Sequence, residues 1–343
     1  MQDVGVGVIG LGRLGYMHAL NLARRTPHAR LVAVCDVAEN LAKETAAELG
    51  CRHYTDFNKM LESRDIDAVC VVTPSAHHVE PVTAVVQSGK ALFCEKPLAA
   101  TMEDNVHLAE IIKAAGILCQ IGFMRRFDPP YVEAEQMIRD GAIGRPVFYN
   151  GIGRDPFPPP PWACDPSRGG GLFIDFLVHD FDCARFLLKD EVARVYADET
   201  NLIVDGQGIN RFADNVTVNL RFKGGALGNC HCSMHSRYGH DIRTEVYGGE
   251  GAIMIGGLHR TEITLCTLEK GICRPTTFLP VGKLAPFAVR FQESYAVELA
   301  AFVECVLDNK PTKVGAADAV EAFRIAMAAV RSAGEKQPVD LEA

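Results

Sequence analysis

Short apolar runs alternate with amphipathic segments through roughly the first 120 residues of the chain. The runs have the length of buried strands, and the segments between them repeat apolar residues at helical spacing. This pattern predicts strands at 4–9, 31–35, 68–72, 91–94 and 118–121. It predicts a helix that ends near residue 25 and further helices at 40–49, 79–87 and 102–115. Strands that alternate with helices in this way form βαβ units and a parallel sheet.

The pattern changes after about residue 123. A helix is predicted at 131–140, and two amphipathic helices at 291–307 and 316–332 follow near the end of the chain. Between them, residues 215–222 alternate apolar and polar side chains, as strands with one buried face do, and glycine turns separate similar segments. We therefore predict a second domain at 123–343, an α+β domain built on a large, open, mostly antiparallel sheet.

The composition is that of an ordinary globular protein, with 48% hydrophobic and 23% charged residues among 343. The net charge is −8 and no basic run occurs, which argues against nucleic acid and membrane surfaces as partners. No apolar stretch reaches the roughly 18 residues that a membrane-spanning helix needs. Residues 1–3 lack the basic segment of a signal peptide. We therefore expect a cytoplasmic protein.

The cysteines are numerous but scattered, and none has the Cys-x-x-Cys spacing. Without a signal peptide, reduced thiols in the core are the expected state. Cys230, His231 and Cys232 form the one dense group, with His235 nearby. In an extended strand the two cysteines share one face and His231 points to the other, which divides the ligands. We therefore predict no metal site.

A glycine-rich motif, Gly-x-Gly-x-x-Gly at residues 10–15, follows the first strand and opens a helix. Gly10 permits the tight turn, Gly12 lets a pyrophosphate approach the backbone, and Gly15 lets the helix pack on the strand. Asp36 ends the second strand, where a carboxylate accepts hydrogen bonds from a ribose, although it can also be a plain turn residue. The strand, the glycine motif and Asp36 together predict a Rossmann domain at 1–122. Because no arginine follows Asp36, we predict that this domain prefers NAD to NADP.

Lys96 follows the strand at 91–94 and lies between Glu95 and Pro97. The carboxyl ends of parallel strands are where open α/β sheets bind ligands, so Lys96 is a candidate for the active site rather than a solvated surface lysine. Thr73 and Pro74 end the preceding strand at the same edge and are expected to line the nicotinamide side. The full set of predicted cofactor-binding residues is Gly10, Gly12, Arg13, Leu14, Gly15, Asp36, Thr73, Pro74, His77, Glu95 and Lys96.

Asp175 and His179 lie four residues apart in a segment that follows three glycines and is predicted to be helical to about Leu188. At this spacing both side chains share one helix face. A carboxylate one turn from an imidazole orients the ring and stabilises its protonated form, as a general base requires. The alternative is a structural helix with an incidental charge pair. Because the neighbouring side chains are apolar, we expect the polar pair to face a cleft.

These motifs together resemble the Gfo/Idh/MocA family of oxidoreductases. The glycine motif, Glu95-Lys96-Pro97 and the segment from the glycines to Asp180 occur in the family's order, and the likeness covers essentially the whole chain. Residues 122–128, 174–185 and 238–248 resemble the inositol dehydrogenase branch of that family. The resemblance implies a Rossmann domain, an α/β domain with an open sheet, and homodimers or homotetramers that pair through these sheets.

The resemblance also implies a function. It makes Lys96, Asp175 and His179 the catalytic residues and places Arg126, Asp155 and Tyr238 near the substrate. We therefore expect NAD-dependent oxidation of a secondary hydroxyl of a cyclic polyol, with myo-inositol as the leading candidate. The alternatives are another inositol isomer or an aldose sugar, and, in a different class, a non-catalytic regulator that binds a dinucleotide and a sugar.

Overall fold

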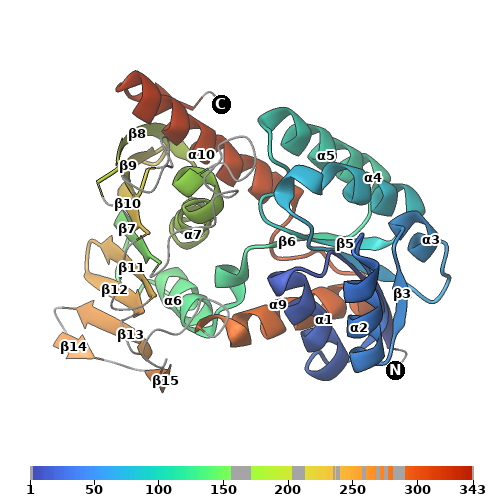
Figure 1. Cartoon of the computed structure of the whole chain (residues 1–343). Helices are drawn as coiled ribbons and strands as arrows, with labels where there is room; N and C mark the ends of the chain where they lie inside the picture. Colours follow the sequence, from blue (N-terminus) through green and yellow to red (C-terminus); the bar gives the residue numbers. More distant parts are fainter. Residues whose placement is uncertain are drawn as a thin grey trace. The chain divides into compact units, whose positions relative to one another are not determined.

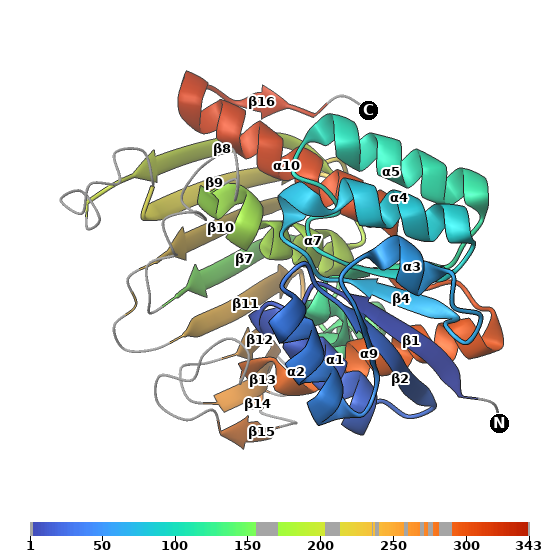
Figure 2. The same ribbon diagram turned by 45° about the vertical axis from the view of Figure 1, so that its right-hand side comes forward.

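The computed structural model describes residues 3–155, 171–202, 213–234, 236, 240–256, 260–267, 271–273, 277–280 and 290–341 (Figures 1 and 2). The chain forms two compact units. The first is Met1–Phe127 with Gln292–Val320, and the second is Asp128–Phe291 with Glu321–Ala343. The sequence pattern predicts a boundary after residue 122 and a single domain beyond it. The structure instead returns residues 292–320 to the first unit.

A parallel sheet of six strands forms the centre of the first unit, in the order β3-β2-β1-β4-β5-β6. In chain order the elements are β1 Val4–Ile9, α1 Arg13–Arg24, β2 Ala29–Cys35, α2 Glu39–Leu49, β3 Arg52–Tyr54, α3 Phe57–Leu61, β4 Ala68–Val71, η1 Ser75–His77, α4 Val79–Ser88, β5 Ala91–Glu95, α5 Met102–Ala115, β6 Cys119–Gly122, η2 Met124–Phe127 and α9 Gln292–Asp308. The predicted parallel α/β fold is confirmed. Short β3 and α3, which carry mostly exposed or half-buried side chains, were not predicted.

Local sequence explains most of these boundaries. β1 is buried along its whole length, because both faces of a parallel sheet are covered by helices. α5 begins after Thr101, whose side chain accepts a hydrogen bond from the backbone N–H of Asp104. The same helix ends at Gly116, which takes the left-handed conformation at φ 65°.

Helix α9 joins the core of the first unit although it lies some 170 residues beyond β6 in the chain. Its Leu299, Phe302 and Val303 are completely buried, in the same cluster as Val6 and Val8 of β1. Their spacing is that of one apolar helix stripe, and each such side chain contributes about 1.5–3 kcal/mol by burial. The stripe predicts a helix with one buried face, but it does not predict which core buries it.

The second unit is built on one large sheet, in the order β14-β13-β12-β11-β7-β10-β9-β8-β16, with β15 paired to β13. Its elements are α6 Pro129–Arg139, β7 Pro146–Arg154, η3 Leu172–Phe176, α7 Val178–Leu188, β8 Val192–Thr200, β9 Asn215–Phe222, β10 Leu227–Ser233, β11 Asp241–Gly248, β12 Gly251–Gly256, β13 Arg260–Thr267, β14 Gly271–Cys273, β15 Thr277–Pro280, α10 Ala316–Glu335 and β16 Val339–Asp340. The boundary between the units falls within α10. The strands pair antiparallel except for β7 and β10, which run parallel, so the prediction of a mostly antiparallel sheet is confirmed.

One face of this sheet is buried and the other is polar. Val216, Val218 and Leu220 of β9 are buried, whereas Thr217 and Asn219 between them are exposed. α7 packs on β7 and β10, and α6 packs on β12 and β13, so helices cover the apolar face (Figure 1). The period-two pattern of the sequence reports this one-sided burial.

The segment after the glycines is not one continuous helix, and that prediction was wrong. Leu172–Phe176 is a turn of π-helix, in which the N–H of Leu177 donates to the carbonyl of Leu172, and α7 begins at Val178. The Phe176 ring packs on Gly153 of β7, where an added Cβ would lie 2.2 Å from a ring carbon. Single π-helical turns are frequent at functional sites.

An acid with no hydrogen-bond partner lies in the first unit. Glu298 of α9 is completely buried, and neither carboxyl oxygen has a hydrogen-bond partner among the residues that the structure describes. Burial, and then the nearby charge of Glu95, raise the pKa of Glu298 well above its usual 4.5. Folding therefore favours the neutral form of this side chain.

Replacing Glu298 with Gln should change how stability depends on pH. Because folding raises the pKa of Glu298, the stability that its proton contributes is fully present below pH 4.5 and is lost as the pH rises above it. The free energy of unfolding of the wild type should therefore fall relative to that of Glu298→Gln as the pH rises above 4.5. The slope of that difference is limited to about 1.4 kcal/mol per pH unit.

Urea unfolding at a series of pH values measures this difference. Glu304→Gln is the matched control, since Glu304 is exposed on the same helix. Its pH curve should run parallel to that of the wild type. A parallel curve for Glu298→Gln as well would show that Glu298 does not hold a proton in the folded protein.

Candidate active site

The carboxyl ends of neighbouring strands carry the predicted cofactor-binding residues. β1 leads into the glycine motif, β2 into Asp36, β4 into Thr73 and β5 into Lys96. β1 pairs with β2 on one side and with β4 on the other, so the strand order reverses at β1. The crevice at such a switch point is the place where open α/β sheets bind dinucleotides.

The three glycines of the motif have the geometry that a dinucleotide requires. Gly10 adopts φ 92°, and a Cβ there would lie 2.8 Å from the backbone of Val72 and Thr73. A Cβ on Gly15 would lie 1.9 Å from the carbonyl oxygen of Gly10. A Cβ on Gly12 would meet no described atom within 4 Å, so the backbone of Gly12 faces open space. The residues present therefore fit a pyrophosphate at this loop.

Asp36 links the glycine loop to the end of β2 through hydrogen bonds. Its Oδ2 accepts a hydrogen bond from the Leu11 N–H at 2.7 Å, and its Oδ1 accepts from the Ala38 N–H at 2.9 Å. Each carboxylate oxygen has a second lone pair, and the side chain is only half-buried. Asp36 can therefore hold the loop and still accept hydrogen bonds from a ribose.

The end of β4 presents a mixture of exposed and buried groups. Thr73 is half-buried, and its hydroxyl donates to the carbonyl of His77 at 3.1 Å. Pro74 and His77 are exposed, whereas His78 is 1% exposed. His77 and His78 are therefore not equivalent, although the sequence gives no sign of the difference.

Lys96 is half-buried, and its backbone is held by Glu95. Glu95 is 5% exposed, and its Oε2 accepts a hydrogen bond from the Lys96 N–H at 3.2 Å. Its Oε1 lies 2.8 Å from Nε2 of His18, which is completely buried on α1. A Cβ on Gly122 would lie 2.7 Å from Glu95 Oε2, so β6 must end in glycine here. His18 belongs to no local motif, so the sequence by itself does not indicate its role.

The second unit carries the other predicted catalytic residues on two different elements. Asp175 is exposed in η3, and His179 is half-buried in α7. The four-residue spacing predicts one helix face; in the structure Asp175 lies in the π-helical turn and His179 in the first turn of α7. Asp155 follows β7, where its N–H donates to the Ser233 carbonyl and its carbonyl accepts from the Ser236 N–H, both at 3.0 Å. Tyr238 lies outside the described residues.

Arg126 lies in η2 of the first unit and is 8% exposed. Its Nη2 lies 2.9 Å from the Asp318 carboxylate, and its Nη1 donates to the Lys313 carbonyl at 3.3 Å. This pairing orients the guanidinium within the first unit. A ligand that contacts Arg126 would therefore contact a guanidinium that already pairs with Asp318.

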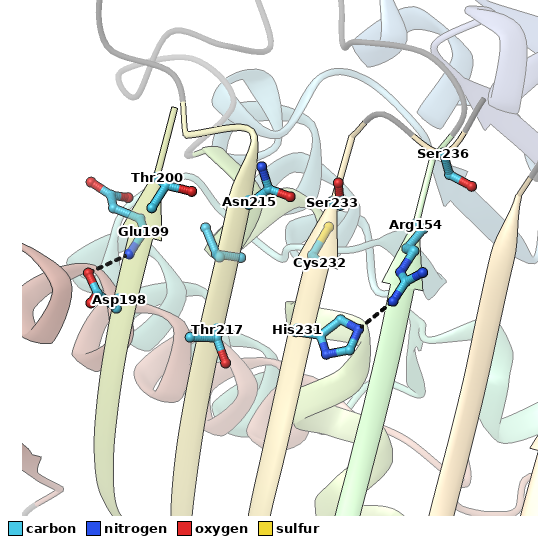
Figure 3. A pocket seen from close by; sticks show the side chains of 11 residues that line it. Arg154, Asp198, Glu199, Thr200, Asn215, Thr217, His231, Cys232, Ser233 and Ser236 are labelled. Atoms are coloured by element: carbon cyan, nitrogen blue, oxygen red, sulfur yellow. Dashed lines mark hydrogen bonds between the residues drawn. The ribbon is translucent and has the colours of Figure 1, made fainter. Parts of the chain in front are cut away.

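A pocket of about 420 Å³ lies on the large sheet of the second unit (Figure 3). The described residues that line it are Arg154, Asp198, Glu199, Thr200, Asn215, Val216, Thr217, His231, Cys232, Ser233 and Ser236. Arg154 and His231 point toward each other, with 3.3 Å between Nη2 and Nε2. Burial and the charge of Arg154 lower the pKa of His231. None of these lining residues belongs to the predicted site, although Arg154 directly precedes Asp155.

Two family models match the chain. The oxidoreductase family with an NAD-binding Rossmann fold, GFO_IDH_MocA, matches residues 4–123, and the GFO/IDH/MocA C-terminal domain matches residues 131–254. The chain therefore belongs to the Gfo/Idh/MocA oxidoreductase family, and its N-terminal unit is an NAD-binding Rossmann fold. The resemblance inferred from the motifs is confirmed.

Relatives with known names match over nearly the full length. A scyllo-inositol 2-dehydrogenase (NAD(+)) of Bacillus subtilis is 38% identical, over 99% of this chain and 97% of its own. A myo-inositol 2-dehydrogenase of Thermotoga maritima is 37% identical, over 98% of both chains. The structure of scyllo-inositol dehydrogenase from Lactobacillus casei with bound NAD(H) and scyllo-inositol superposes with a TM-score of 0.85, at 28% identity and 99% coverage of both chains.

Substituting Gly12 with Ala should weaken NAD binding without harming the fold. The new Cβ meets no described protein atom within 4 Å, but it occupies the space where the pyrophosphate approaches the backbone. We expect the Kd for NAD to rise by about tenfold or more, which corresponds to about 1.4 kcal/mol. Calorimetric titration with NAD measures the Kd, and thermal unfolding without NAD measures the fold.

Gly15→Ala is the companion variant. Its Cβ would lie 1.9 Å from the Gly10 carbonyl, so the helix must shift and the unfolding temperature should fall even without NAD. Wild-type affinity for NAD in Gly12→Ala would contradict the placement of the pyrophosphate at this loop.

Proposed function

We propose that this protein is an NAD-dependent dehydrogenase that oxidises a secondary hydroxyl of a cyclic polyol, most specifically myo-inositol, to give 2-keto-myo-inositol (scyllo-inosose). The observation that carries this proposal is full-length similarity, at 37–38% identity, to two inositol 2-dehydrogenases. The glycine loop and Asp36 provide the matching dinucleotide site. Both relatives are enzymes, which favours catalysis over a non-catalytic sensing role.

The preferred isomer is the open part of this proposal. One relative is named for scyllo-inositol and the other for myo-inositol. A site that pairs each substrate hydroxyl rejects an isomer that leaves a buried polar group unpaired. A panel of inositol isomers, glucose and other aldoses, followed by NADH absorbance, identifies the substrate. A higher kcat/KM for an aldose than for every inositol would overturn the proposed substrate class, and no NADH from any of them would overturn the dehydrogenase.

His179 is proposed as the general base. It is half-buried, so its imidazole is partly shielded from solvent yet accessible to a ligand. A neutral imidazole can take the hydroxyl proton, and Asp175 would orient the ring and stabilise the imidazolium. Bound NAD supplies the nicotinamide ring that accepts the hydride.

Lys96 is proposed to stabilise the reacting oxygen. The oxygen gains negative charge as its proton leaves, and an ammonium group held at a fixed place stabilises that charge without reorganisation. The hydrogen bond from the Lys96 N–H to Glu95 fixes the backbone that carries this ammonium group. Lys96 thus acts as the cation and His179 as the base.

Arg126, Asp155 and Tyr238 are proposed to bind the remaining hydroxyls. Asp155 is half-buried and has its backbone held on both sides by Ser233 and Ser236. Arg126 is already paired with Asp318, so its guanidinium would contact both Asp318 and the substrate. The second unit would thus serve as the substrate-binding domain.

Around the cofactor we propose two groups of contacts. Asp36 would bind the adenosine ribose and repel a 2′-phosphate, which favours NAD over NADP. The second group, in addition to the glycines and Asp36, is proposed to contact the cofactor and consists of Arg13, Leu14, Thr73, Pro74, His77, Glu95 and Lys96.

The assembly and location of the protein are also proposals. The polar face of the large sheet, with exposed Thr217 and Asn219, is proposed as the surface through which two or four copies associate. Sedimentation velocity tests this, and the mass of a single chain at micromolar concentration would contradict it. Among the described residues no helix is long and apolar enough to cross a membrane. We propose a cytoplasmic enzyme.

Lys96→Ala and His179→Ala should each lose most turnover with NAD and myo-inositol. Removing a general base typically costs about 10²–10⁴ in rate, and loss of the cation should be of similar size. Steady-state kcat from NADH absorbance measures the loss, and calorimetry should find NAD binding retained in both variants.

Two matched controls use exposed residues of α5. His107→Ala and Lys113→Ala remove the same side-chain types from the surface and should leave kcat unchanged. Near-wild-type kcat in His179→Ala at pH 7 would remove His179 as the base. Loss of NAD binding in Lys96→Ala would count against its proposed role at the reacting oxygen.

A further inference from the structure

His78 is a buried histidine that the proposed chemistry does not use. It lies between η1 and α4, directly after the exposed His77, and only 1% of it is exposed. A buried imidazole needs hydrogen-bond partners for its ring nitrogens, because an unsatisfied polar group in the interior costs free energy. The partners of His78 come from two different strand ends.

One side of the ring faces the end of β4, and the other faces the end of β5. Nε2 lies 2.8 Å from the Thr73 carbonyl oxygen. Nδ1 lies 3.0 Å from the Pro97 carbonyl oxygen and 3.3 Å from that of Leu98. β4 and β5 are neighbours in the sheet, with Val71 paired to Cys94. The imidazole therefore bridges two adjacent strand ends at the carboxyl edge.

These carbonyls constrain what the ring can do, because a carbonyl oxygen only accepts hydrogen bonds. A neutral imidazole has one N–H and can satisfy one strand end, whereas a ring with two N–H groups satisfies both. Burial lowers the pKa of His78 below its usual 6.5, although the three carbonyl oxygens and the Glu95 charge oppose this shift. The Cys94 thiol lies 3.6 Å from Nδ1 and 3.4 Å from the Glu95 carbonyl. When the thiol donates to the Glu95 carbonyl, Nδ1 does not have to accept from it, which allows Nδ1 to carry the proton and donate to Pro97.

The Pro97 carbonyl lies one residue beyond Lys96, so this contact acts on the backbone of the proposed catalytic cation. The Lys96 N–H is held on the other side by Glu95 Oε2 at 3.2 Å. We propose that His78 is a positioning residue for Lys96, because its Nδ1–H fixes the Pro97 carbonyl and thereby the backbone from which the Lys96 ammonium extends. This inference rests on the proposed role of Lys96.

Two amide substitutions separate the two sides of the ring. The side-chain nitrogen of Asn takes the place of Nδ1, so His78→Asn retains a donor toward Pro97. The side-chain nitrogen of Gln takes the place of Nε2, so His78→Gln retains a donor toward Thr73. The pair changes the same buried residue to similar neutral amides, which makes each variant the control for the other.

His78→Asn should retain kcat within about threefold of the wild type, whereas His78→Gln should lose about a hundredfold, because small displacements of catalytic groups carry losses of that size. The Kd for NAD should stay unchanged in His78→Gln. A kcat in His78→Gln equal to or above that of His78→Asn would overturn the proposal, since the Thr73 side or simple packing would then account for His78.

A double variant separates positioning from general damage. If His78 acts through Lys96, adding His78→Gln to Lys96→Ala should cause no further loss of kcat. A further tenfold loss would indicate a structural role independent of Lys96. If Lys96→Ala itself retains wild-type turnover, the proposed role of Lys96 has failed, and the single-variant comparison still shows whether His78 affects turnover.

A measurement on the wild type covers the case in which an amide variant does not fold. Nitrogen NMR of protein labelled with 15N-histidine reports which ring nitrogens carry protons. A protonated, hydrogen-bonded Nδ1 on His78 is expected, and an unprotonated Nδ1 would overturn the proposal.

Discussion

The buried carboxyl group of Glu95 is the contact on which the cofactor edge depends. Its Oε1 lies 2.8 Å from His18 on α1, and its Oε2 accepts the Lys96 N–H at 3.2 Å. Removing a carboxyl group from water costs free energy, and these hydrogen bonds offset that cost for Glu95. They join the helix that opens at the glycine loop to the residue that follows β5. The cofactor loop and the proposed catalytic cation are therefore parts of one hydrogen-bonded arrangement.

Neighbouring features adjust to this buried group. Gly122 leaves the space that Glu95 needs, because a side chain there would lie 2.7 Å from Oε2. Burial, and then the nearby charge of Glu95, raise the pKa of Glu298 of α9. Two acidic groups can share an interior when one keeps its proton, since two ionised groups would repel each other in a medium of low dielectric constant. The helix that supplies Glu298 also supplies Leu299 and Phe302 to the core.

In the second unit, the close approach of side chains to glycines of β7 places the proposed residues. Gly153 of β7 admits the Phe176 ring, and Gly151 admits the Asp180 carboxylate, where a Cβ would lie 2.6 Å from Oδ1. The π-helical turn and α7 can therefore pack directly on the sheet. This packing fixes the backbone positions of Asp175 and His179. Similarity to inositol dehydrogenases over the full chain makes polyol oxidation the function that these placements support.

The sequence alone determined the parallel sheet, the glycine loop with Asp36 at its edge, and the one-sided burial of the second sheet. Each depends on local pattern: the period of apolar residues, a loop motif, or the residue that ends a strand. Only the tertiary structure decided that α9 joins the first core, that a π-helical turn interrupts the predicted helix, and that His18 and His78 face the ends of β5 and β4. These features depend on contacts between residues far apart in the chain, or on packing against a neighbouring strand. No local pattern records such contacts, so neighbouring His77 and His78 look alike in sequence although one is exposed and the other is 1% exposed.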